Sequence, residues 1–220
     1  MPTTRLLHPL FLLVSRFLRT FFNWLYHPLA FSYDLVAATV SLGRWNDWVR
    51  TALPLIEGRR VLELGHGPGH LQRSLRTLGL PAVGLDESTQ MGRLAARRLR
   101  NSGYTQINLI RGLAQALPFP VGTFDTIVST FPSEYIFDAH TLSEAHRVLH
   151  NGGRLIVLPA AWPRNPLLGW LFRITGQSPA EALEIVKTKL RQPFDDAGFE
   201  VEVQTFDVQS GRLLIVIAHK

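Results

Sequence analysis

The chain has 220 residues, of which 46% are hydrophobic and 18% are charged, with a formal net charge of +6 at pH 7. This length predicts one globular domain with a substantial core, and the absence of cysteine excludes a disulfide framework, thiolate catalysis and a cysteine-ligated metal. The mild positive excess suits an anionic membrane, a nucleic acid or an acidic substrate without distinguishing among them.

Residues 5–31 combine a basic stripe with broad apolar faces. The apolar run between Arg5 and Arg16 covers ten residues, whereas a membrane-spanning helix needs about 20, and no small-residue cleavage site of a signal peptide follows. Arg, His and Asn side chains recur at helical spacing along one stripe, while Leu, Phe and Trp occupy the other faces. Two interpretations stay open: a helix lying in the plane of a membrane surface, or a helix that covers the protein's own apolar surface or pairs in a homodimer.

Two shorter helical patterns follow at 32–43 and 44–53, and the second ends before a proline. We interpret Trp45 and Trp48, both in the second pattern, as helix-packing residues. Residues 1–54 are therefore predicted to form N-terminal cap helices ahead of the main domain.

The rest of the chain is organised around residues 61–70. Four residues of strand character run into three glycines at alternate positions, Gly65, Gly67 and Gly69, and a helical pattern follows. Glycine is needed where the backbone takes a positive φ or approaches a ligand closely, and a helix N-terminus favours a carboxylate or phosphate. The Gly-x-Gly-x-Gly spacing differs from the Gly-x-Gly-x-x-Gly of dinucleotide sites, which disfavours an NAD-binding protein.

Two acidic residues accompany these glycines. Glu63 lies two positions before the first glycine, and Asp86 ends the next predicted strand. An acid at the end of that strand can accept hydrogen bonds from both hydroxyls of a ribose. Glycines alone are compatible with a purely structural turn, but together with the two acids they indicate a nucleoside-binding site.

From residue 55 the chain alternates strands and helices, which predicts an α/β domain with a doubly wound parallel sheet. Strands are expected at 60–64, 81–86, 106–110, 124–129, 154–158, 199–207 and 212–219. Helices are expected at 69–78, 88–101 and 138–149. A short turn joins the last two strands, so they form a hairpin and the last strand is antiparallel.

Two further segments carry arginines. We interpret the four arginines of the helix at 88–101 as a solvated face, and no nucleic-acid binding is predicted because aromatic residues are not interleaved with them. Residues 159–178 contain aromatic and basic residues without an acid, and they predict an apolar lid at the mouth of the site. This lid either takes up a lipophilic substrate or packs on the protein itself.

Several motifs together resemble class I S-adenosylmethionine-dependent methyltransferases. Residues 63–69 resemble motif I, residues 83–88 motif II, and residues 114–119 the "AxxLPF" segment. Residues 124–129 are similar to the strand that follows, and residues 144–153 to the helix and turn before the fifth strand. The resemblance implies a seven-stranded Rossmann-like methyltransferase domain over residues 55–220.

The helical patterns at 32–43 and 44–53 resemble one group within this family. They are similar to those of the ubiquinone and menaquinone biosynthesis C-methyltransferases, a group related to bacterial phosphatidylethanolamine N-methyltransferases. The resemblance implies S-adenosyl-L-methionine as the cofactor, with no metal. The cofactor-binding residues that it implies are Tyr33, Glu63, Gly65, His66, Gly67, Gly69, Asp86, Glu87, Met91, Leu113, Ala114, Ser129 and Thr130.

The roles follow the order of the motifs in these relatives. The glycines admit the methionine moiety, Glu63 shapes their loop, and Asp86 holds the ribose. Glu87 and Met91 are expected near the ribose and adenine. The adenine is expected to meet the segment around 113–114, the methyl donor to face residues 129–130, and the Tyr33 segment to cover the pocket.

Two positions need separate comment. Leu113 stands where relatives often carry an aspartate that bonds the adenine amino group, so that contact has to come from elsewhere, with Gln115 as one candidate. His66 occupies a variable position inside the glycine loop. It either faces solvent or contacts the carboxylate of the cofactor.

Methyl transfer from a sulfonium is an in-line displacement, for which an enzyme mainly supplies proximity, alignment and desolvation. A general base is required only if the acceptor must lose a proton. Residues able to act as that base are present, and none of them is assigned: Tyr33, Glu134, Tyr135, His140 and His146.

We therefore expect a methyltransferase acting on a small lipophilic acceptor, either a quinone precursor or a phospholipid amine. Its expected location is the cytoplasm, with peripheral contact to the inner face of the membrane through residues 5–31 and 159–178. One alternative is a soluble small-molecule methyltransferase whose N-terminal helix lies in a dimer interface. Another is a non-catalytic binding module with the same fold.

Overall fold

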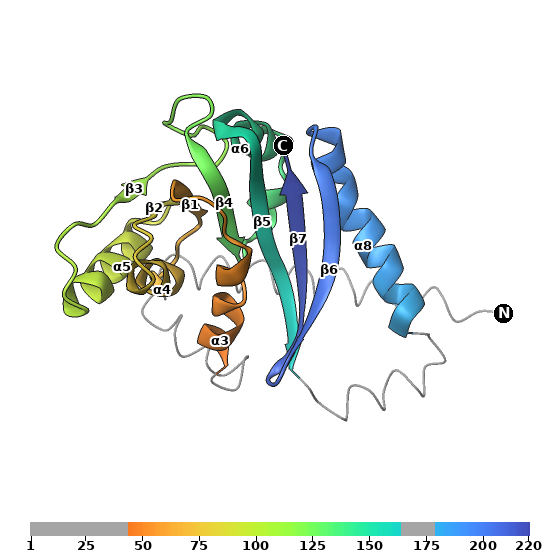
Figure 1. The fold of residues 1–220 in the computed structure, drawn as a ribbon, viewed down its shortest axis with the longest axis horizontal. Coiled ribbons are helices and arrows are strands. Elements are labelled where there is room, and N and C mark those ends of the chain that lie inside the picture. Colours follow the sequence, from red (N-terminus) through yellow and green to blue (C-terminus); the bar gives the residue numbers. More distant parts are fainter. Residues whose placement is uncertain (1–43, 164–178) are drawn as a thin grey trace, which may run out of the picture.

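The computed structural model describes residues 44–163 and 179–220, which form one seven-stranded sheet with accompanying helices (Figure 1). The strand order is β3-β2-β1-β4-β5-β7-β6. The helical patterns predicted at 5–31 and 32–43, and most of the predicted lid, lie outside the described residues.

The strands are β1 (Val61–Leu64), β2 (Val83–Asp86), β3 (Leu109–Arg111), β4 (Phe124–Thr130), β5 (Leu149–Pro163), β6 (Glu200–Val208) and β7 (Gly211–His219). The α-helices are α3 (Trp45–Arg50), α4 (His70–Thr77), α5 (Thr89–Asn101), α6 (Ala139–Val148) and α8 (Pro179–Asp196). Two 3-10 helices are also present, η2 (Leu53–Leu55) and η3 (Glu134–Phe137). The doubly wound sheet predicted from the alternating pattern is therefore confirmed.

The pairing of the strands places a ligand site. β1 lies between β2 and β4 and is parallel to both, so the strand order reverses direction at β1. Ligands of open α/β sheets bind beyond the carboxyl ends of the strands at such a switch point. β7 is antiparallel to both of its neighbours, which confirms the predicted terminal hairpin.

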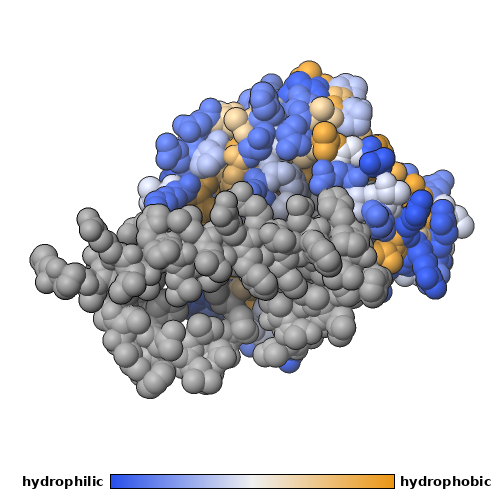
Figure 2. Space-filling model, turned by 180° about the vertical axis from the view of Figure 1, so that it is seen from behind, coloured by the Kyte–Doolittle hydropathy of each residue, from blue (hydrophilic) through white to orange (hydrophobic). Residues whose placement is uncertain are grey.

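The two faces of the sheet are covered by different helices. Successive residues of a strand point to opposite faces, and in β4 Ile127 packs in a core with Val148 of α6 and Phe194 of α8. The next residue, Val128, packs in a second core with Leu71 of α4 and Trp48 of α3. The packing role predicted for Trp48 is confirmed. Figure 2 shows one face of the molecule, where the described surface is mainly hydrophilic with scattered hydrophobic residues.

The largest difference from the predicted boundaries is at β5. β5 runs from Leu149 to Pro163 instead of 154–158, because β7 offers it backbone partners as far as Gly211, with a register shift between Val157 and Ala160. The first residues of the predicted lid, 159–163, therefore belong to a strand.

The helix predicted at 44–53 ends earlier than expected. α3 stops at Arg50, and η2 follows with a proline in its first turn. Pro54 has no N–H to donate to the Arg50 carbonyl four residues earlier, and its ring would clash with that carbonyl, which accounts for the end of the α-helix at Arg50.

The Glu144 and Arg147 pair of the predicted motif braces the segment that carries Ala114. The Leu117 N–H donates to Glu144 Oε2 over 2.8 Å. The Arg147 guanidinium donates to the carbonyls of Phe119 and Leu117 over 2.8 and 3.0 Å. The Arg147 hydrogen bond also lowers the pKa of Glu144. This motif therefore has a structural role, holding residues 114–119 against α6.

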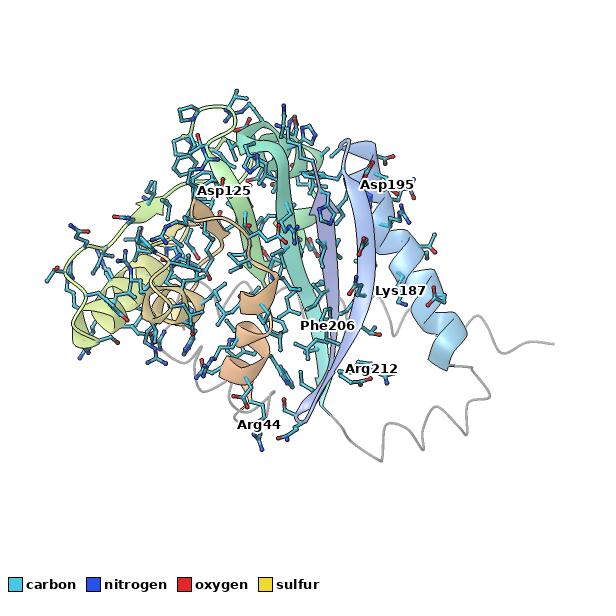
Figure 3. All side chains as sticks on the ribbon, viewed as in Figure 1. Arg44, Asp125, Lys187, Asp195, Phe206 and Arg212 are labelled. Carbon is cyan, nitrogen blue, oxygen red and sulfur yellow. The ribbon has the colours of Figure 1, made fainter. Side chains whose placement is uncertain are left out.

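Asp125 ties together the amino end of the sheet, and Figure 3 shows it at the opposite end from Arg44 and Arg212. Its Oδ2 accepts hydrogen bonds from the Arg59 and Arg60 N–H groups, both at 2.9 Å. The Arg60 side chain, which donates to Oδ1, is the main cause that lowers the pKa of Asp125 to about 2.

The Asp125→Asn variant is expected to lose about 1 to 2 kcal/mol of unfolding free energy at pH 7, because a charge-assisted contact is replaced by a neutral one. The carboxylate contributes fully above its ordinary pKa of 3.8, and this contribution is lost as the pH falls through about 2. Urea unfolding of the wild type and the variant, at pH 7 and near pH 2, measures the free energy of unfolding under each condition. A difference between variant and wild type that is equal at the two pH values would contradict this role.

Candidate cofactor site

The loop between β1 and α4 is built from left-handed glycines. Gly65, Gly67 and Gly69 have φ values of 68°, 49° and 83°. A Cβ on Gly65 would lie 2.3 Å from the Tyr135 hydroxyl oxygen, and one on Gly69 would lie 2.8 Å from the Ala95 Cβ. A Cβ on Gly67 would meet nothing within 4 Å. Two of the glycines thus permit close packing, and the third leaves an open surface.

Two hydroxyl groups hold this loop from beneath. The Ser129 and Tyr135 hydroxyls donate to the Leu64 carbonyl over 2.7 and 3.1 Å, and their oxygens lie 3.0 Å apart. Ser129 is fully buried and is not among the residues that line the cavity described below. The sequence led us to expect Ser129 to face the methyl donor and left Tyr135 unassigned among the possible bases; these contacts give both residues a supporting role.

Asp86 connects the glycine loop to the start of α5. Its Oδ2 accepts a hydrogen bond from the Gly67 N–H and its Oδ1 from the Ser88 N–H, each over 2.8 Å. Ser88 caps α5 in turn, since its hydroxyl accepts from the Met91 N–H over 3.3 Å. A carboxylate has about four acceptor sites, so Asp86 retains capacity for two ligand hydroxyls.

His66 is buried, with 4% of its surface exposed, so the alternative in which it faces solvent is wrong. Its Nδ1 lies 2.7 Å from the Gly67 carbonyl oxygen, and a carbonyl only accepts, so Nδ1 carries the hydrogen. Burial lowers the pKa of His66, while the charge of Asp86 opposes that shift. The space comes from Gly84, where a Cβ would lie 3.1 Å from the imidazole. The sequence signal for the burial of His66 was Gly84 itself, a glycine inside a predicted strand, which often marks a close approach of another group.

Glu63, on β1 just before the loop, is a buried acid. It is 1% exposed, and its Oε2 has no hydrogen-bond partner among the described residues. Burial raises the pKa of Glu63 well above its ordinary value, the nearby Gln72 amide opposes the rise, and the charge of Asp86 adds to it. The Gln72 amide acts on the carboxyl from nearby without reaching hydrogen-bond geometry. A buried carboxyl oxygen without a partner suits a cationic ligand group.

A narrow cavity of about 20 Å³ opens above the loop, with room for about one water molecule. It is lined by Trp45, Val49, Glu63, Gly65, His66, Gly67, Pro68, His70, Leu71 and Thr130. The Trp45 ring lies 4.2 Å from the Phe131 ring, centroid to centroid. Phe131 has a φ of 51° and is the one non-glycine residue with positive φ in the described part of the chain. Such strain is typical of functional sites. The sequence predicted neither the place of Trp45 in the cavity wall nor the strained backbone of Phe131.

The other predicted residues surround Asp86. The Gly112 N–H donates to the Asp86 carbonyl over 3.1 Å, which brings the 113–114 segment beside it. Leu113 is 54% exposed and Ala114 is buried. Glu87 is exposed, and Met91 is buried on α5. Tyr33 lies outside the described residues.

The described ranges contain neither a candidate metal site nor a membrane-spanning helix. Within residues 44–163 and 179–220, no group of His, Cys, Asp or Glu side chains is arranged to hold a metal ion. No helix in these ranges is long and apolar enough to cross a membrane.

Comparison with known proteins agrees with this geometry. Residues 62–157 match the family described as a methyltransferase domain. The chain is 33% identical over 156 residues to the demethylmenaquinone methyltransferase of Thermus thermophilus, covering 68% of this chain and 70% of that one. It is 32% identical over 146 residues to a ubiquinone/menaquinone biosynthesis C-methyltransferase of Pasteurella multocida, covering 63% of this chain. The chain spans 54% of the length of that second relative.

A solved structure shares the fold. A SAM-dependent methyltransferase from Aquifex aeolicus superposes with a TM-score of 0.55 at 22% identity, covering 79% of this chain and 88% of that one. The family match contains the complete glycine loop and Asp86. The orphaned Glu63 oxygen and the open face of Gly67 fit the methionine end of S-adenosylmethionine. The chain therefore belongs to the class I S-adenosyl-L-methionine-dependent methyltransferases, with S-adenosyl-L-methionine as its cofactor.

Proposed function

We propose that this enzyme methylates a lipophilic small molecule, with a demethylated quinone precursor as the acceptor. The observation that carries this proposal is the likeness to the Thermus thermophilus enzyme, a demethylmenaquinone methyltransferase, over more than two thirds of that protein. The apolar, basic segments at 5–31 and 159–178 support an acceptor drawn from a membrane. Peripheral contact with the cytoplasmic face of the membrane is part of the same proposal.

The proposed organisation of the chain has two parts. Residues 1–54 form cap helices, and residues 55–220 form the methyltransferase domain, with its lid beginning after Pro163. The lid and the cap together shield the acceptor from water. Pairing of two copies through the cap is the alternative use of the N-terminal segment.

The bound cofactor supplies a methyl group that is already activated as a sulfonium. Glu63 receives the ammonium end of the cofactor, and the open face of Gly67 admits its methionine backbone. Asp86 accepts hydrogen bonds from the ribose hydroxyls while it holds the loop through the Gly67 N–H.

Residues at the rim complete the proposed cofactor site. Leu113 and Ala114 contact the adenine beside Asp86, with Glu87 and Met91 on the α5 side. Thr130, at the end of β4, faces the methyl donor from the cavity wall.

The aromatic pair Trp45 and Phe131 closes the cavity on the α3 side and excludes water from it. Alignment and desolvation are what such a transfer requires of the protein. A quinol carbon that takes the methyl group must lose its proton, and this proton passes to the solvent. We assign no side chain as the base, and Tyr135 is engaged beneath the loop.

Transfer of a labelled methyl group tests the acceptor. The full chain is incubated with radiolabelled S-adenosylmethionine and one of three acceptors: demethylmenaquinol in detergent micelles, phosphatidylethanolamine vesicles, or a water-soluble naphthoquinol without the isoprenoid tail. We expect label in the micellar quinol, little in the soluble analogue, and none with the Asp86→Ala variant. Label only in the phospholipid, or equal label with and without the tail, would overturn the proposed acceptor.

A further inference from the structure

Gln72 is a buried amide that no motif explains. It is fully buried on α4, and neither atom of its side-chain amide has a hydrogen-bond partner in the described part of the structure. Leaving such a group unpaired is costly, and each case in a native protein needs an explanation. The flanking positions Leu71 and Leu75 are core residues, so the helix presents this amide to the sheet.

The amide lies directly over the acid of the glycine loop. Glu63 of β1 and Gly84 of β2 are paired neighbours in the sheet. A Cβ on Gly84 would lie 3.0 Å from Gln72 Nε2, so the missing side chain makes room for the amide there. Val61 packs on the α4 face, and Glu63, two residues on, points to the same face. An unpaired carboxyl oxygen and an unpaired amide therefore share one buried space beneath the cavity.

The groups around Glu63 leave its charge uncompensated. Asp86 acts on it from β2, and His66 of the loop and His70 at the start of α4 line the same cavity. Among the described residues, the charged group that shifts the pKa of Glu63 is Asp86, which raises it. His66 donates through Nδ1 to a carbonyl, and burial lowers its pKa, so it supplies no cation near neutral pH. A carboxylate in this position lacks a counterion until a cationic ligand arrives.

We infer that Gln72 is a positioning residue for a proton-linked cofactor site: Glu63 is a carboxylic acid before the cofactor binds, releases its proton on binding, and is then held as a carboxylate by the Gln72 amide. The Glu63 O–H bond breaks, and the proton passes to the buffer. The carboxylate formed accepts hydrogen bonds from the cofactor ammonium and from Gln72 Nε2–H. This inference rests on the proposed assignment of Glu63 to the ammonium end.

The inference predicts a pH dependence of cofactor affinity. Below the raised pKa of Glu63, binding must remove a proton, so the affinity falls about tenfold for each unit by which the pH decreases. In the free protein the nearby amide already opposes the rise in the pKa of Glu63, so removing the amide moves the midpoint of this dependence to higher pH. A purely structural role of Gln72 would lower stability without moving the midpoint.

Calorimetric titration of the full chain with S-adenosylhomocysteine tests the inference. Titrations between pH 5.5 and 7.5, in buffers of low and high ionisation enthalpy, report the number of protons released on binding. This range stays below the titration of the ligand's amino group, since even a peptide α-amino group, which lacks the adjacent carboxylate, has a pKa of about 7.7 to 8.0. The variants are Glu63→Gln, which has no proton to release, and Gln72→Met, which keeps the size of the side chain. Gln192→Met removes an exposed amide on α8 and is the matched control.

We expect the wild type to release up to one proton per ligand, and Glu63→Gln to release fewer at every pH. The Gln72→Met midpoint is expected to shift upward by about half a unit or more, and the control is expected to match the wild type. Proton release that is the same in wild type and Glu63→Gln overturns the inference, because it then comes from His66 or another group. An unchanged midpoint in a folded Gln72→Met protein overturns the role of Gln72. Absence of ligand binding by the wild type would instead contradict the proposed function.

Discussion

The Asp86→Ala variant is expected to bind S-adenosylhomocysteine at least about 100-fold more weakly than the wild type. The carboxylate holds the Gly67 and Ser88 N–H groups, each at 2.8 Å, and by our proposal it also receives the ribose hydroxyls. Hydrogen bonds to a charged group contribute about 1.5 to 3 kcal/mol each, so the loss of two ligand contacts alone accounts for this factor. Calorimetric titration at pH 7 measures the dissociation constant.

A matched carboxylate separates affinity from stability. Asp125 also accepts hydrogen bonds from two backbone N–H groups, but it lies at the start of β4, beside the residues that precede β1, whereas the glycine loop follows β1. We expect Asp125→Asn to be less stable and to bind the ligand as the wild type does. Wild-type affinity in a folded Asp86→Ala protein would remove Asp86 from the site.

The Gly67→Ala variant is expected to fold and to lose most of its cofactor affinity, by a factor of about 100 or more. A methyl group at this position meets no protein atom within 4 Å, so the protein has room for it. The remaining cost is the left-handed backbone, at about 1 to 2 kcal/mol. A cofactor that lies against the open face of the loop meets the added methyl group directly.

Gly79→Ala is the control for Gly67→Ala. Gly79 has a φ of 71°, and a Cβ there also meets nothing within 4 Å, but it lies in the turn after α4. Chemical unfolding should give both variants a similar loss of stability, and calorimetry should give only Gly67→Ala a loss of affinity. Equal affinities of the two variants would show that no ligand approaches Gly67.

The sequence correctly predicted the features that depend on residues close together in the chain. The glycine loop, Asp86 and the alternating strands were predictable because glycine spacing, strand ends and helix starts depend on neighbouring residues. The seven strands followed from the family resemblance, and the antiparallel last strand followed from the short turn of the terminal hairpin. The loop conformation is confirmed by the positive φ of all three glycines.

The parts that escaped prediction depend on contacts between distant residues. Trp45 belongs to the cavity because it meets Phe131, and no local pattern links the two. The burial of His66 follows from the missing side chain of Gly84 on the neighbouring strand. β5 is longer than predicted because β7 offers it backbone partners. No pattern within β5 itself predicts this pairing.

A crystal structure of the full chain with S-adenosylhomocysteine tests the central claim most directly. The account predicts the ribose hydroxyls within hydrogen-bond distance of the Asp86 carboxylate and the ligand's ammonium group beside Glu63. It also predicts the methionine backbone across the open face of Gly67. A ligand bound elsewhere, with Asp86 and Glu63 making only the contacts described above, would contradict it.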